Sequence, residues 1–204
     1  MKVVLLLIVL SIVGCAGIPL SSVYKMMTAN PLDFHPDAIS IAIKRSNVIQ
    51  LKTGDVEMNF FIDSENPDLK VLQQYFLVVD NTPRIPIIAE GLNNNEALTV
   101  LTLSPEDVIR MQDLQKMMKS HLKNGGENKD FGFSVRVLEG CKNTNDIPDN
   151  VFVSLFLKLD SRSDFFPLYE DFDIGQADVS PLKNLVNWNN CQNNVNKLDA
   201  NTSH

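Results

Sequence analysis

Apolar and polar residues alternate along much of the chain with the two-residue period of a β-strand. The alternation is clearest at 39–44 and 56–63, and we expect a strand with one buried face at each place. The run Tyr75–Val79, within residues 72–80, is apolar throughout, which predicts a strand buried on both faces. Further strands are predicted at 97–103, 131–138, 151–160 and 165–169 and, beside Pro83 and Pro86, a short edge strand at 85–90.

One segment has the period of an amphipathic helix. Ser104 and Pro105 are suited to the N-cap and first position of a helix, and acidic residues follow in the first turn. Apolar residues then recur at intervals of three and four, which predicts a helix over about 105–123 that Gly125-Gly126 ends. The apolar stripe consists of Val108, Met111, Leu114, Met118 and Leu122. A shorter helix capped by a serine is predicted just after residue 20.

Together these elements predict a mainly β (α+β) fold, an antiparallel β-sandwich or sheet of about six to seven strands with one inserted amphipathic helix. The strands at 131–138 and 151–160 are neighbours in sequence, and we expect them to pair as a hairpin across a polar loop. The chain has no repeat and no linker, so residues 23–191 are predicted to form one β-rich domain. We expect a short helix after Ser180-Pro181 and disorder in the Asn-rich tail 192–204.

The N-terminus has the features of an export signal. Met1-Lys2 is a minimal positive start, and residues 3–13 are apolar apart from Ser11. A helix needs about 20 apolar residues to cross the hydrocarbon core, so this run is too short for a transmembrane segment. We therefore expect residues 1–14 to be a signal peptide.

That segment ends in Ile12-Val13-Gly14-Cys15, which resembles the bacterial lipobox. The resemblance implies that a diacylglycerol is attached to the Cys15 sulfur, that the chain is cleaved before Cys15, and that the new amino group is acylated. Two or three acyl chains give durable membrane attachment. Residues 15–22 would form a lipidated tether, and Ala16 in place of an Asp implies the outer membrane, facing the periplasm. An ordinary signal peptide or an uncleaved apolar segment, with Cys15 incidental, is the alternative.

Charge and hydropathy restrict the partners of the chain. The formal net charge is -7, from 25 acidic and 18 basic residues, and no basic run is present. Such a surface repels phosphate backbones, so we expect no nucleic-acid binding. No later segment has about 18 consecutive apolar residues, so the N-terminal lipid is the membrane attachment we expect. The other expected partner is an envelope protein that the sequence does not identify.

With Cys15 assigned to the lipid, Cys141 and Cys191 remain as an even pair in an oxidising compartment. Both lie in polar, turn-like surroundings. We expect them to form a disulfide, because exposed free thiols are reactive outside the cytoplasm. Two separate free thiols are the alternative.

Residues suited to catalysis or metal binding are few. His35, His121 and His204 have no metal-type spacing, and the chain has no G-x-S-x-G or phosphate-binding motif. The acidic groups at 146–149 and 170–173 lack the order of an EF-hand and are typical of turns. We therefore expect no catalytic residue, no metal and no cofactor, and a protein that is not an enzyme.

Two wider resemblances bear on function. Residues 20–24, 30–32 and 39–43, with 153–157 and 166–168, resemble uncharacterised bacterial lipoproteins, and no activity comes with that resemblance. A predicted sandwich with an inserted helix behind a lipid anchor is also similar to the type VI secretion lipoprotein. Here Ile39–Ile43 stands in place of that family's strand sequence. A secretion-system accessory lipoprotein is therefore one alternative.

Two functions fit these features. The first is a non-catalytic envelope protein that binds a protein partner or supports an assembly. The second is a carrier or sensor of a small apolar or lipid ligand, with the methionine-bearing helix as its lid. An enclosed apolar cavity beneath Met111, Leu114 and Met118 would favour the carrier. A filled core with an exposed apolar patch would favour the protein-binding module.

Overall fold

The computed structural model describes residues 19–63, 70–81, 87–123, 130–144, 151–173 and 189–191. The predicted tail 192–204, the helix predicted after Ser180-Pro181 and the Gly125-Gly126 helix end lie outside these residues.

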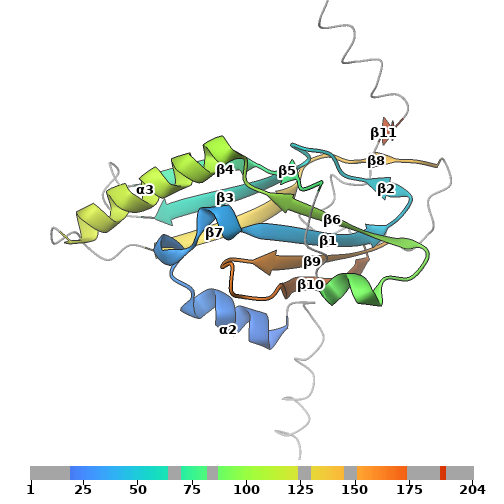
Figure 1. Ribbon diagram of the computed structural model, residues 1–204, viewed down its shortest axis with the longest axis horizontal. Helices are drawn as coiled ribbons and strands as arrows, with labels where there is room; N and C mark the ends of the chain where they lie inside the picture. The colour runs from blue at the N-terminus through green and yellow to red at the C-terminus, as the bar shows by residue number, and fades with distance from the viewer. Residues whose placement is uncertain are drawn as a thin grey trace, which may run out of the picture.

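Within the described residues the protein is mainly β, with seven strands of six to eight residues (Figure 1). These strands are β1 (Ser40–Ser46), β3 (Val56–Asp63), β4 (Val71–Phe76), β6 (Glu96–Thr102), β7 (Asp130–Val137), β9 (Phe152–Lys158) and β10 (Phe166–Asp173). The two-residue strands are β2 (Ile49–Gln50), β5 (Val78–Val79), β8 (Cys141–Lys142) and β11 (Asn189–Asn190). The helices are α2 (Leu20–Thr28) and α3 (Pro105–Lys123), with 3-10 turns η2 (Pro31–Asp33), η3 (Pro36–Ala38) and η5 (Ile87–Gly91).

The strands form two main sheets and one small one. The five-stranded sheet has the order β10-β9-β1-β6-β5, and the three-stranded sheet has the order β4-β3-β7. All strand pairs in these two sheets are antiparallel. The small sheet has the order β11-β8-β2, and its β11–β8 pair is parallel. The predicted mainly β, antiparallel fold is confirmed.

The two main sheets share one hydrophobic core. Ile41 and Ile43 of β1 and Met58 and Phe60 of β3 belong to the same buried cluster, although they come from different sheets. Alternate residues of each strand point to the same face, so the polar positions between them face outward. This arrangement is a β-sandwich.

Helix α3 covers one side of this core, beside β4 (Figure 1). Its bounds agree with the predicted 105–123. Ser104 caps it, because the Asp107 N–H donates to Ser104 Oγ at 3.1 Å. Met111 and Met118 are fully buried and belong to the core cluster.

Helix α2 also exists, but its predicted serine cap is wrong. Pro19 is the N-cap residue and makes no side-chain cap hydrogen bond. Ser22 lies within the helix and is fully buried. Since α2 begins at Leu20, the last part of the segment expected as tether, 15–22, is helical.

The prediction that the run Tyr75–Val79, within the strand expected at 72–80, is buried on both faces is wrong. Leu72 is 66% exposed and Phe76 is 52% exposed. The strand is divided at Leu77, since β4 belongs to the three-stranded sheet and β5 to the five-stranded sheet. The chain passes from one sheet to the other at this point, so part of the apolar run packs in the core that the two sheets share. The outer face of β4 stays exposed to solvent.

The predicted hairpin of residues 131–138 with 151–160 is also wrong. β7 pairs with β3, with Phe133 opposite Phe60, whereas β9 pairs with β1, with Leu157 opposite Ile41. Adjacent strands pair often but not always, and here the connection between them crosses from one sheet to the other.

The prediction of an edge strand at 85–90 is wrong for residues 87–90, the part that the structure describes, because Ile87–Gly91 is the 3-10 turn η5. Ile88 packs against Ala42 and Phe156 on the outer face of the five-stranded sheet. The turn therefore covers apolar residues instead of extending a sheet.

Candidate functional site

The proposed lipidation site lies outside the described residues. Cys15 and the lipobox residues Ile12, Val13 and Gly14 precede Pro19, where the description begins. Lipid attachment therefore stays a prediction. Neither α-helix in the described part of the chain has the length and apolar character needed to cross a membrane.

The predicted cysteine pair is joined in the structure by a disulfide between Cys141 and Cys191. The two Cα atoms are 4.9 Å apart, within the range that disulfides adopt. Cys141 lies in β8 and Cys191 directly follows β11, which pairs in parallel with β8. The disulfide therefore links the segment 189–191 covalently to β8, which lies between β7 and β9 in the chain.

The structure does not bring the candidate polar residues together. His35 lies between η2 and η3, His121 lies in the last turn of α3, and His204 is not described. In the described ranges no three His, Cys, Asp or Glu side chains form a group that could hold a metal ion. The acidic group 146–149 lies outside those ranges. In 170–173, Asp173 Oδ1 accepts a hydrogen bond from the Val151 N–H at 3.2 Å.

One polar cluster that sequence reasoning missed lies on the outer face of the five-stranded sheet. Lys44 Nζ lies 3.5 Å from Glu96 Oε1 and 3.4 Å from Asp171 Oδ1. Ser154 Oγ donates to Asp171 Oδ1 at 3.3 Å, and the Asp171 N–H donates back to Ser154 Oγ at 2.9 Å. Ser154 is fully buried, so its hydroxyl is inaccessible as a nucleophile.

The outer face of the β4-β3-β7 sheet carries three exposed apolar side chains. Phe61 is 38% exposed, Leu72 is 66% exposed and Phe76 is 52% exposed. Phe61 stands opposite Leu72 in the β3–β4 register, so the two are cross-strand neighbours. On its other side Phe61 stands opposite Gly132, where an added Cβ would overlap the Phe61 ring. We call Phe61, Leu72 and Phe76 the apolar face.

A buried carboxylate lies next to the apolar face. Glu57 is 3% exposed and stands opposite both Phe76 of β4 and Arg136 of β7. Arg136 donates two hydrogen bonds to Glu57 Oε1, from Nη2 at 2.6 Å and from Nε at 3.1 Å. The Asn59 and Gln74 amides also donate to this carboxylate.

These hydrogen bonds determine the ionisation of Glu57. Burial by itself would raise the pKa of Glu57, but the hydrogen bonds from Arg136 and Asn59 outweigh burial, and the pKa lies below its ordinary value. The carboxylate is therefore charged, and its hydrogen bonds link the three strands on the same outward face that carries the exposed apolar side chains.

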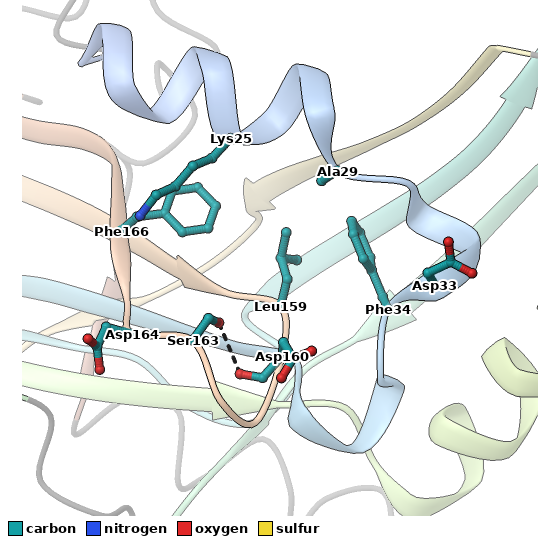
Figure 2. A pocket seen from close by; sticks show the side chains of 9 residues that line it. All are labelled: Lys25, Ala29, Asp33, Phe34, Leu159, Asp160, Ser163, Asp164 and Phe166. Atoms are coloured by element: carbon teal, nitrogen blue, oxygen red, sulfur yellow. Dashed lines mark hydrogen bonds between the residues drawn. The ribbon is translucent and has the colours of Figure 1, made fainter.

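The core beneath α3 is occupied by side chains. Met111 and Met118 belong to the same buried cluster as Phe60 and Tyr75. A pocket of about 250 Å³ lies elsewhere, between α2 and the start of β10 (Figure 2). Met111 and Met118 are therefore core residues, and the described residues combine a packed core beneath α3 with an exposed apolar face.

Comparison with protein-family models, with curated proteins and with solved structures found no match to this chain.

Proposed function

We propose that this chain is a lipid-anchored protein of the bacterial cell envelope that binds a protein partner and has no catalytic activity. Cys15 would carry the lipid, and the β-sandwich would dock its partner through the apolar face. The alternative proposal for the same architecture is a secretion-system accessory lipoprotein, similar to the type VI secretion lipoprotein.

The observation that carries the docking proposal is the exposure of Phe61, Leu72 and Phe76 on one sheet face. Large apolar side chains exposed together on a sheet mark interaction sites more often than single ones do. Glu57 accepts hydrogen bonds from Arg136 of β7 and Gln74 of β4 on this same face, so the strands that carry the apolar face are joined before any partner binds. Aromatic residues on a rigid, pre-organised surface are typical anchors of protein interfaces.

Site-specific crosslinking in intact cells tests this proposal. A photoreactive residue in place of Phe76 should capture one discrete envelope protein, and the product should disappear when Leu72→Arg is added. The matched control is Ile109→Arg, because Ile109 is 59% exposed and lies on α3, outside the β4-β3-β7 sheet. Equal loss of the product with Leu72→Arg and Ile109→Arg, or no product from position 76, would contradict docking through this face.

A further inference from the structure

The pocket between α2 and β10 combines aromatic walls with acidic groups. Figure 2 shows Phe34 and Phe166 on opposite sides of the pocket, with Leu159 between them. Phe34 is held in place by an edge-to-face contact with Phe133, at a centroid distance of 6.2 Å. Phe166 is buried in the core at the start of β10. The two walls are therefore fixed by the sandwich.

A cation already lies against one of these walls. The Lys25 ammonium of α2 lies 5.1 Å from the centroid of the Phe166 ring. An ammonium within about 6 Å of an aromatic centroid is attracted by the electron-rich ring face. The Phe166 ring is thus a surface that receives a cation in this fold.

The pocket lining also contains a carboxylate that can accept a cation. Asp33, Asp160 and Asp164 line it, and Lys25 is the one cation among the described lining residues. The Arg162 N–H donates to Asp160 Oδ1 at 2.7 Å and lowers the pKa of Asp160. Asp33 is paired with Lys119 Nζ at 3.1 Å and Asp160 with Arg162 Nε at 3.5 Å, which leaves Asp164, among the described residues, as the lining carboxylate available to an added cation.

We propose that this pocket binds the ammonium group of a small organic cation, which takes the position of the Lys25 ammonium on the Phe166 ring. Aromatic walls with adjacent negative charge are the usual means of binding quaternary ammonium groups. The volume of about 250 Å³ lies below the roughly 300–1,000 Å³ of pockets that enclose drug-sized ligands. The pocket therefore suits a compact head group and does not enclose a lipid tail.

The ammonium can come from a soluble amine or from a phospholipid head group. If Cys15 carries the lipid, the five residues 15–19 that precede α2 span at most about 18 Å, so α2 would stay near the head groups. The head-group source rests on the proposed lipid anchor, whereas binding of a soluble amine does not.

Calorimetric titration of the purified full chain with choline tests the site, with 3,3-dimethylbutan-1-ol as the neutral isostere. Lys25→Ala removes the competing ammonium and should raise choline affinity by about threefold to tenfold, with clear preference over the isostere. Lys116→Ala is the matched control, because Lys116 is exposed on α3 and paired with Asp113, and it should titrate as the wild type does. Adding Phe166→Leu to Lys25→Ala should abolish the preference for choline over the isostere.

The proposal is overturned if Lys25→Ala binds choline no more tightly than the wild type, including the case of no binding by either. It is also overturned if the isostere binds Lys25→Ala as well as choline does. To distinguish a soluble amine from a phospholipid head group, the Cys15→Ser chain is mixed with phosphatidylcholine or phosphatidylglycerol vesicles. Choline-competed binding to the phosphatidylcholine vesicles assigns the site to a head group, and choline binding without vesicle binding assigns it to a soluble amine. Failure of the lipid anchor would leave the choline result unchanged, so the two proposals fail separately.

Discussion

Glu57 is the residue on which the outer face of the β4-β3-β7 sheet depends. It accepts hydrogen bonds from Arg136, Asn59 and Gln74, and it is nearly inaccessible to solvent. Replacing it by Gln at neutral pH should lower the free energy of unfolding by about 2 kcal/mol, because hydrogen bonds to a charged group are weakened. Urea denaturation measures this change. Glu170→Gln, an exposed carboxylate on β10, is the control and should stay within about 0.5 kcal/mol of the wild type.

The same residue predicts a pH dependence with a defined sign. The pKa of Glu57 is lower in the folded chain than its ordinary value, so its contribution is complete above the unfolded pKa of about 4.3. That contribution is lost as the pH falls below this value and through the folded pKa. The stability difference between the wild type and Glu57→Gln should therefore shrink between pH 5 and about pH 3. A difference that is constant over this range would show that the Glu57 charge does not brace the sheet.

At the scale of single elements, α3 contributes to stability through one side. Met111 is 1% exposed and Met117 is 52% exposed on the same helix. Met111→Ala should cost about 2–5 kcal/mol by loss of burial and formation of a cavity. Met117→Ala should change stability by less than about 0.5 kcal/mol. Equal effects in urea denaturation would contradict the described orientation of α3.

The disulfide makes a second prediction at this scale. The bond between Cys141 and Cys191 has a sequence separation of 50. Closing a loop of that length stabilises a fold by about 4 kcal/mol in the chain-entropy model. The double variant Cys141→Ser/Cys191→Ser should lose about this amount. Adding a reductant should destabilise the wild type and leave the double variant unchanged; a wild type insensitive to reductant would count against the bond.

Elements with purely local signals were predictable from the sequence. Helix α3 was predicted with its observed bounds, because the Ser104 cap and the three-and-four spacing of apolar residues are both local. The strands β1 and β3 followed in the same way from alternation over 39–44 and 56–63. The choice of strand partner was not predictable, because the pairs β3–β7 and β1–β9 join residues far apart in the chain.

The apolar face was missed for a related reason. Phe61 follows Phe60 in β3, and Phe76 follows Tyr75 in β4, so each strand has apolar residues at adjacent positions. Such runs are typical of strands buried on both faces, and they cannot be distinguished by sequence from a strand with one exposed apolar face. The alternation of β3 nevertheless contained this information. Phe61 is four residues after Glu57, so both side chains point to the same, outward face of the sheet.

At the scale of the whole molecule, the proposed anchor and the pocket lie near one another in the chain, and the apolar face lies on a different sheet. The proposed anchor at Cys15 comes shortly before α2, which packs against β10 and contributes Lys25 to the proposed ammonium pocket. The apolar face lies on the other main sheet, on strands β3 and β4. One end of the domain would thus meet the membrane, while a different sheet remains open to a protein partner.

The proposal that this is a lipid-anchored protein depends on the chemistry of Cys15. Its most direct test is the mass of the N-terminal peptide from the protein extracted from membranes of cells that express the full chain. We expect a peptide that begins at Cys15, lacks residues 1–14, and carries a diacylglycerol on sulfur with an acyl group on the new amino group. A peptide that begins elsewhere, or one in which Cys15 is unmodified, would contradict the account.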